Sequence, residues 1–245
     1  MKLKSIFQAV GELIFVPRCC ACDAPLPSST SGPRELHHFF CDSCADTVSL
    51  WGPPCCTRCG DTFEGEGPSH LCSDCLKSPP EFNAVFAMGL YGGALAIAIS
   101  RFKYGPQPWM GKRLGQLAAL AHPTETFDTI VPIPLHPRRL VARGFNQSAL
   151  IAREIGAIHN TPVTYNALSR TVHSLPQAAL SRIDRQRAMR NSFSMPSGSS
   201  LRNKRVLLVD DVVTTGATVD AASRVLKKEN RAASVHVLCL ARSIR

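Results

Sequence analysis

Hydrophobic and polar positions follow two different patterns on either side of Pro79-Pro80. After these prolines, short apolar runs typical of buried strands alternate with stretches whose apolar residues recur at helical spacing. In one such helix Leu95, Ile99 and Phe102 share a face. Strands or extended segments are expected over residues 84–92, 129–133, 162–168, 205–209 and 234–240, and helices over 94–104, 111–121, 146–158 and 217–229. This alternation predicts an α/β fold with a parallel sheet and helices on both faces.

The part before Pro79-Pro80 is rich in Cys, Pro, Gly and Ser and has few periodic segments. We therefore divide the chain into residues 1–16, 17–80 and 81–245. Residues 1–16 predict a short amphipathic helix packed on the protein, and a helix at a membrane surface is the alternative. Polar Gln8 and Glu12 interrupt the apolar run, which disfavours a signal peptide. No stretch is long and apolar enough to span a membrane.

The composition indicates a globular, basic protein. Of its 245 residues 44% are hydrophobic, and the formal charge of +10 gives a pI near 9.3. Such a charge favours an anionic partner, either a phosphorylated metabolite or nucleic acid, although a merely soluble basic surface has the same composition.

Cysteine spacing predicts two zinc sites. Ten of the 11 cysteines lie between Cys19 and Cys75, mostly as C-x-x-C pairs, and two such pairs offer the four thiolates of a structural site. The predicted ligand sets are Cys19, Cys22, Cys41 and Cys44, followed by Cys56, Cys59, Cys72 and Cys75. Together these sets predict a small double zinc ribbon that depends on two structural zinc ions. Zinc rather than disulfides implies the reducing cytoplasm.

Other assignments remain open for this region. Cys20 and Cys55 stand beside Cys19 and Cys56, so the ligand register has an alternative one residue away. The x-x spacing favours Cys19 and Cys56. Redox C-x-x-C pairs or an iron–sulfur cluster are competing chemistries, and His37, His38 and His70 are substitute ligands. The remaining Cys239 is expected in the core, because it lies in a buried strand.

The segment 206–218 combines an apolar strand, two adjacent acids and a turn that opens a helix. Ligands bind at this position of an open α/β sheet. Free N–H groups at a helix N-terminus bind phosphate, and Gly216 lets the backbone approach it. Asp210 and Asp211 suit sugar hydroxyls instead. The alternative is a strand–helix connection without a ligand.

This segment resembles the fingerprint of type I phosphoribosyltransferases. The resemblance implies that Asp210 and Asp211 bind the ribose 2′- and 3′-hydroxyls of 5-phosphoribosyl-1-pyrophosphate and help to place Mg²⁺. It also implies a cradle for the 5′-phosphate, made by Val213, Thr214, Thr215, Gly216, Ala217 and Thr218.

A basic connector over residues 131–148 is expected as a strand end, a basic turn and a helix that starts after Asn146. The type I fold places its pyrophosphate site in the loop after this strand, which makes Pro134, Leu135 and His136 binding candidates. Cationic donors that suit phosphate oxygens are Arg138, Arg139 and Arg143, and Arg143 is the catalytic candidate beside the acids. An exposed basic loop is the alternative.

The string Arg143-Gly-Phe-Asn-Gln, with Pro-x-Pro-Leu-His upstream, resembles the ComF/GntX family. That family joins an N-terminal zinc ribbon to a phosphoribosyltransferase domain, and the resemblance extends from Cys19 to Leu240. Residues 170–193 resemble its mobile loop, with Arg170, Gln177 and Arg185 as weaker site candidates and Ala188 in place of the usual Asn. The resemblance implies a role in DNA uptake, natural competence or the use of external DNA.

Three functions are compatible with these features. A phosphoribosyltransferase would displace pyrophosphate from the sugar in favour of an acceptor that the sequence does not identify. A single-stranded-DNA-binding protein would use the basic charge to bind phosphates and aromatic side chains to stack on bases. The candidate aromatic residues are Tyr91, Phe102, Tyr104 and Trp109, although aromatic residues more often lie in the core. A docking module would hold a helicase-like or membrane-channel partner. We predict a zinc-containing protein of DNA uptake or processing that binds Mg²⁺ and phosphoribosyl pyrophosphate.

Overall fold

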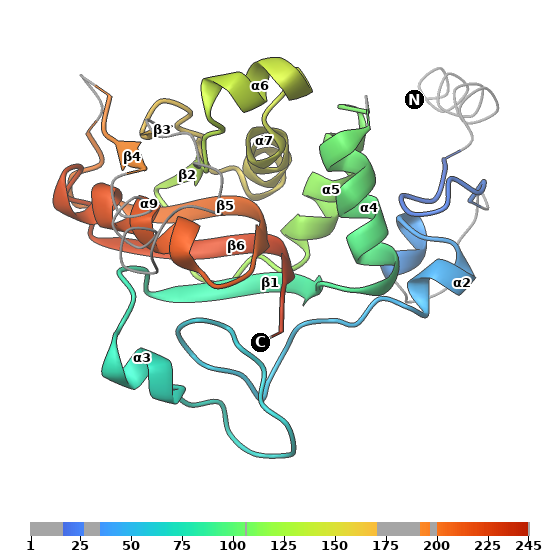
Figure 1. The fold of residues 1–245 in the computed structure, drawn as a ribbon, viewed down its shortest axis with the longest axis horizontal. Coiled ribbons are helices and arrows are strands. Elements are labelled where there is room, and N and C mark those ends of the chain that lie inside the picture. Colours follow the sequence, from blue (N-terminus) through green and yellow to red (C-terminus); the bar gives the residue numbers. More distant parts are fainter. Residues whose placement is uncertain (1–16, 27–34, 106, 171–191, 197–199, 245) are drawn as a thin grey trace, which may run out of the picture.

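A computed structural model describes residues 17–26, 35–105, 107–170, 192–196 and 200–244 (Figure 1). In these residues four strands form a parallel sheet in the order β1-β6-β5-β2. The strands are β1 (Ala84–Leu90), β2 (Thr129–Pro132), β5 (Arg205–Val213) and β6 (Ser234–Arg242). The extended segment after α7 continues the sheet beyond β2, because Val163 bridges Ile130 in parallel.

Helices cover both faces of the sheet, as the sequence predicted. They are α4 (Gly93–Tyr104), α5 (Met110–Ala119), α7 (Gln147–His159) and α9 (Ala217–Lys228). Successive side chains of a strand point to opposite faces. Leu207 and Val209 of β5 therefore pack with α4, α5 and α7, whereas Val206 and Leu208 pack with α9. The predicted apolar face of α4 is fully buried in the first of these cores.

The largest differences from the sequence prediction concern α6 and β5. Residues Pro137–Arg143, expected as a basic turn, form the short helix α6, which starts with a proline and is capped by His136. None of its residues is buried, so there is no apolar periodicity to reveal it. Strand β5 also continues past Val209 to Val213, because Asp210 and Val212 still pair with Cys239 and Ala241 of β6.

The cysteine-rich part packs directly on the sheet and its helices. It contains the short helices η1 (Glu35–His38), α2 (Asp42–Ala45) and α3 (Ser73–Lys77). Cys19 and Cys20 belong to the core of α4 and α5, whereas Cys56, Cys59 and Cys75 belong to the core of α9. Between the two groups, the chain runs antiparallel to the free edge of β1, with Leu50 opposite Gly89. This segment places one cysteine group on each side of the sheet.

The predicted loop 170–193 begins and ends in two short paired strands. The short strands β3 (Ser169–Arg170) and β4 (Phe193–Ser194) pair antiparallel, so the two ends of that loop meet. Most of the loop lies outside the described residues, as does the predicted helix 1–16. Within the described ranges, no helix has the length and apolar character needed to cross a membrane.

Candidate functional site

The two adjacent acids lie near the carboxyl end of β5, in the middle of the sheet. The Asp210 Oδ1 atom accepts hydrogen bonds from the Ser148 hydroxyl at 3.0 Å and from the Asp211 N–H at 2.9 Å. Asp211, only 9% exposed, forms an ion pair with Lys103 of α4 through atoms 2.8 Å apart. The positive charge of the Lys103 ammonium group therefore acts on both carboxylates.

The charge of Asp210 is correspondingly unfavourable. Burial and the negative charge of Asp211 raise its pKa to about 7, although the Asp211 N–H, the Lys103 charge and the Ser148 hydroxyl each act in the opposite direction. A cation or a sugar hydroxyl bound to this oxygen would favour the ionised form. Oxygen ligands of this kind also suit Mg²⁺, so the acid pair fits the ion that the sequence predicted.

The loop after β5 presents exposed backbone at the start of α9. Gly216 is the N-cap residue and has φ of +81°, a left-handed conformation that a residue without Cβ adopts at little cost. Thr214, Thr215 and Ala217 are exposed, and Gly216 and Thr218 are partly buried. The predicted phosphate cradle is therefore an open loop at a helix N-terminus, directly after the acids.

The loop after β2 reaches the acid pair through the first turn of α7. The Asn146 side chain caps α7 by accepting the Ser148 N–H at 3.1 Å and donates to the Ile133 carbonyl at 3.0 Å. This cap fixes Ser148, whose hydroxyl donates to Asp210. The predicted binding residues Pro134, Leu135 and His136 are partly buried between β2 and α6. The structure thus brings the two predicted loops together at one edge of the sheet.

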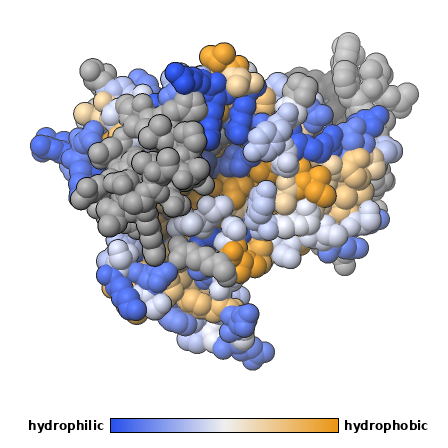
Figure 2. Space-filling model, viewed as in Figure 1, coloured by the Kyte–Doolittle hydropathy of each residue, from blue (hydrophilic) through white to orange (hydrophobic). Residues whose placement is uncertain are grey.

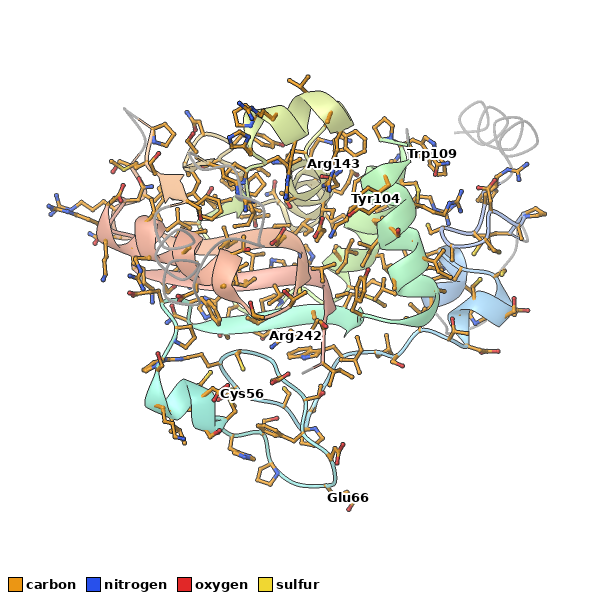
Figure 3. All side chains as sticks on the ribbon, viewed as in Figure 1. Cys56, Glu66, Tyr104, Trp109, Arg143 and Arg242 are labelled. Carbon is orange, nitrogen blue, oxygen red and sulfur yellow. The ribbon has the colours of Figure 1, made fainter. Side chains whose placement is uncertain are left out.

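The basic residues are distributed unevenly around this edge. Arg143 lies 5.4 Å from the ring centroid of Tyr104 and donates to the Gln147 side chain at 3.1 Å (Figure 3). Arg138 and Arg139 are on the exposed helix α6. Hydrophilic residues gather at this top edge of the molecule (Figure 2). Within α6 the apolar side chain of Val141 is 85% exposed.

Arg170 also lies near the site. Its guanidinium is 5.3 Å from the Phe193 ring centroid. Burial and the charge of Arg139 lower its pKa, whereas the charge of Asp210 raises it. The other candidates in the loop, Gln177 and Arg185, and the variant position Ala188 lie outside the described residues.

Sequence reasoning missed Lys103 and Ser148. Lys103 is more than a hundred positions from Asp211 in the chain, and only the packing of α4 beside the sheet brings them together. Ser148 follows the capping residue Asn146 by two positions. In the sequence Asn146 indicates the start of a helix, but nothing indicates that Ser148 contacts Asp210. The candidate aromatic residues differ in their solvent exposure. Phe102 is a core residue, whereas Tyr91, Tyr104 and Trp109 are 46%, 78% and 50% exposed.

The cysteines form two groups of four, Cys19, Cys22, Cys41 and Cys44, and Cys56, Cys59, Cys72 and Cys75. Within each group all Sγ atoms lie within 4.8 Å of one another, which fits structural zinc. Burial alone would raise the pKa of Cys56, but N–H groups of Cys72 and Cys59 reach its sulfur at 3.4 and 3.5 Å and lower the pKa to about 6. The thiolate form that a metal requires is therefore favoured at Cys56, whereas burial raises the pKa of Cys59 in the same group to about 11.

The alternative ligands lie elsewhere. Cys20 and Cys55 are outside both groups, and burial raises the pKa of the Cys20 thiol to about 11. His37 pairs with Asp42 at 2.8 Å, and His70 stacks on Phe63 with ring centroids 4.3 Å apart. Cys239 is fully buried in β6, as the sequence predicted.

Comparisons with known proteins agree with this architecture. The double zinc ribbon domain family matches residues 10–76, and the phosphoribosyl transferase domain family matches residues 156–244. Competence protein F of Haemophilus influenzae is 32% identical over 219 residues, which are 86% of this chain and 91% of that protein. DNA utilization protein YhgH of Escherichia coli K12 is 30% identical and covered to 94%, with 86% of this chain. Competence protein ComFC of Bacillus subtilis is 25% identical, over 83% of this chain and 84% of its own length.

Proposed function

Because the chain belongs to the competence protein F family, with a double zinc ribbon and a phosphoribosyltransferase-type domain, we propose that it binds 5-phosphoribosyl-1-pyrophosphate with Mg²⁺ and acts in DNA uptake or in the use of external DNA. The role in DNA follows from relatives that are named for competence or for DNA utilization. The ligand is proposed from the geometry of the acid pair and the two loops beside it.

One contact carries this proposal, the hydrogen bond from Ser148 to Asp210. It joins the first turn of α7, which follows the loop after β2, to the acids of β5, and these two segments are separated in the chain by some sixty residues. A ligand with phosphate groups at both ends and a sugar between them matches this order of phosphate loop, acids and basic loop. A site for a phosphate group alone would not need acidic residues beside the phosphate loop.

Each part of the site has a proposed role. Asp210 and Asp211 take the ribose hydroxyls and Mg²⁺, and residues 213–218 take the 5′-phosphate. Pro134, Leu135, His136 and Arg143 lie on the side of the pyrophosphate, and Lys103 balances the charge of Asp211 until the ligand binds. The two cysteine groups hold structural zinc.

Turnover is the further step of this proposal. A transfer reaction breaks the bond between the anomeric carbon and the pyrophosphate oxygen while an acceptor forms a bond to the same carbon, and pyrophosphate leaves with the electron pair. Positioning and charge stabilisation supply most of the catalysis in such a reaction. We assign Arg143 to the leaving pyrophosphate, because it ends α6 and its guanidinium is held beside the start of α7 by Tyr104 and Gln147.

Isothermal calorimetry of zinc-loaded protein with Mg²⁺ and phosphoribosyl pyrophosphate tests the binding site. The Asp210→Asn/Asp211→Asn double variant should lose binding. Uncharged amides bind Mg²⁺ less strongly than carboxylates and accept weaker hydrogen bonds from the ribose hydroxyls. Asp128→Asn is the matched control. Its carboxylate lies just before β2 and accepts the Arg205 N–H at 2.7 Å, at the amino end of the same two strands.

Saturable, Mg²⁺-dependent binding by the wild type and by the control, but not by the double variant, supports the site. Equal binding by all three proteins, or none by folded wild-type protein, contradicts it. Pyrophosphate release with added acceptors then tests turnover separately.

A second candidate function is binding of single-stranded DNA. The observations in its favour are Tyr104, which is 78% exposed beside the Arg143 guanidinium, and Trp109, which is 50% exposed at the start of α5. Exposed aromatic rings among basic residues stack on bases and neutralise phosphates. This surface adjoins the proposed phosphoribosyl site, so the two functions are compatible.

Fluorescence anisotropy with a labelled oligonucleotide, measured over a range of salt concentrations, tests this candidate. Tyr104→Ala/Trp109→Ala should weaken binding roughly tenfold or more, as expected for the loss of one or two stacked bases. A steep loss of affinity with salt supports contact with the phosphates. Unchanged affinity in the double variant contradicts the stacking surface and favours a protein partner, such as a helicase or channel, for this face.

A further inference from the structure

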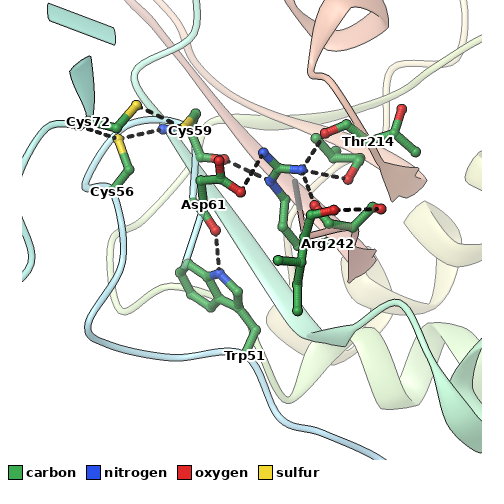
Figure 4. A network of polar contacts seen from close by, with 11 residues as sticks. Trp51, Cys56, Cys59, Asp61, Cys72, Thr214 and Arg242 are labelled. Carbon is green, nitrogen blue, oxygen red and sulfur yellow. Dashed lines mark hydrogen bonds and ion pairs between the residues drawn. The ribbon is translucent and has the colours of Figure 1, made fainter. Parts of the chain in front are cut away.

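Arg242, the last residue of β6, is a buried cation between the second cysteine group and the phosphate loop. Its side chain is 1% exposed and is among the largest fully buried side chains of the described residues. A buried guanidinium requires acceptors for its donors, since an unpaired charge is costly away from water. Figure 4 shows acceptors on two sides of the guanidinium, in the turn around Cys59 on one side and at Thr214 on the other.

On the zinc side, Arg242 holds the Cys56–Cys59 turn, the first C-x-x-C turn of the second cysteine group. Its Nε donates to the Cys59 carbonyl at 3.0 Å, and its Nη2 forms an ion pair with Asp61 at 3.5 Å. Between these two residues Gly60 has φ of +69°, and its carbonyl accepts the Trp51 indole N–H at 2.8 Å. The turn that presents the Cys59 thiolate is thus held from the sheet by Arg242 and from the linker by Trp51.

On the ligand side, Arg242 holds the backbone where the phosphate loop begins. Its Nη1 donates to the carbonyls of Val213, at 3.2 Å, and of Thr214. In a planar trans peptide the carbonyl and the following N–H point in opposite directions. These bonds therefore turn the N–H groups of Thr214 and Thr215 away from Arg242. Both threonines are exposed, and the guanidinium also places a positive charge behind the loop.

We propose that Arg242 is a positioning residue that couples the second zinc site to the phosphate loop. With zinc bound, the Cys59 turn is fixed, Arg242 is held in place, and the loop donors are oriented for phosphate. Coupling between two sites is reciprocal, so a phosphate ligand should also stabilise the second zinc site. This inference rests on the proposed function, because it requires the loop to bind a phosphorylated ligand.

The first cysteine group offers a matched comparison. Arg101 of α4 plays a similar structural part there, donating to the carbonyls of Cys20 and Ala21 at 3.3 and 2.9 Å and pairing with Asp23 at 3.2 Å. Its hydrogen bonds join the first zinc site to a helix rather than to the phosphate loop. Arg101→Met therefore removes an arginine anchor of the same kind without the predicted effect on the loop.

Two measurements on the full chain test the coupling. The first is pulsed alkylation with N-ethylmaleimide, read by mass spectrometry for each cysteine, with and without Mg²⁺-phosphoribosyl pyrophosphate. In the wild type the ligand should slow alkylation of Cys59, Cys72 and Cys75 severalfold and leave Cys22 and Cys44 unchanged. The second is calorimetric affinity, which should fall about tenfold in Arg242→Met, the usual effect of losing a charged hydrogen bond.

Arg101→Met should retain the ligand affinity of the wild type. Asp61→Asn is a milder second variant, which keeps Arg242 and weakens its link to the zinc turn, and it should reduce the protection of the second group. Equal protection of both cysteine groups by the ligand, or wild-type affinity in a folded Arg242→Met, overturns the coupling. Failure of the wild type to bind the ligand overturns the proposed site itself, which is a different and separately visible result.

Discussion

At the scale of single residues, the pair Asp210 and Asp211 determines the chemistry of the site. The two carboxylates are adjacent in one strand, and Lys103 is close to Asp211. Sequence patterns identified the acids because two like charges in succession bring nothing to a strand. They did not identify Lys103 or Ser148, because these contacts depend on how α4 and α7 pack against β5.

The shifted pKa of Asp210 predicts a pH dependence of stability. Burial and the charge of Asp211 raise this pKa from 3.8 to about 7. Because the folded state holds the proton more tightly, the contribution to stability is complete below about pH 4 and is lost as pH rises to about 7. In ligand-free protein, urea unfolding should show a smaller decrease in the free energy of unfolding over this range for Asp210→Asn than for the wild type.

Lys103→Met provides the complementary test. The Lys103 charge lowers the pKa of Asp210, so its removal should move the decrease in stability to higher pH. It also leaves the Asp211 carboxylate without its ion pair, at a cost of about 1–3 kcal/mol for a largely buried group. An unchanged pH profile in this variant would show that the lysine does not influence the acid pair.

At the scale of elements, the fold could be predicted where packing follows periodicity. The helix α4 was visible because its apolar residues face one core, and the strands β1 and β6 were visible as apolar runs because they are buried on both faces. The helix α6 was not visible, because all its residues avoid burial and its start depends on Pro137 and the His136 cap. The end of β5 was wrong by four residues, since pairing with β6 continues past the acids.

The start of α9 gives a prediction at this scale. Gly216→Ala places a Cβ on a residue with φ of +81°, where the nearest side-chain atom, on Phe82, is 3.7 Å away. The cost is therefore one of backbone conformation, about 1–2 kcal/mol. We expect weaker binding of Mg²⁺-phosphoribosyl pyrophosphate by calorimetry, because the loop must change its conformation. Gly52→Ala is the control, since Gly52 has open space around its Cβ position, and equal affinity losses in both variants would contradict this reason.

At the scale of the whole molecule, the cysteine groups are part of the two hydrophobic cores. Cys19 and Phe40 pack with α4 and α5, and Cys56 and Cys75 pack with Phe82 and Val85 beneath the sheet. Sequence spacing predicted the two groups of cysteines. It did not predict that they lie against opposite faces of the sheet, because this depends on the antiparallel contact of residues 49–51 with β1.

Removal of zinc should consequently destabilise the sheet as well as the cysteine-rich part. A strong chelator should lower the midpoint of thermal unfolding followed by far-ultraviolet circular dichroism, by about 2–4 °C for each kcal/mol lost in a chain of this size. Added zinc should restore the midpoint if it is supplied before heating. An unchanged circular dichroism transition after complete removal of zinc would contradict the shared cores.

Hydrogen–deuterium exchange with and without Mg²⁺-phosphoribosyl pyrophosphate is the decisive test of the proposed phosphoribosyl site, because it locates the ligand on the chain. We predict protection of peptides that contain residues 210–220 and 134–148, and loss of this protection in the Asp210→Asn/Asp211→Asn variant. Protection confined to other segments, or equal protection in the variant, would contradict a phosphoribosyl site at the carboxyl end of β5.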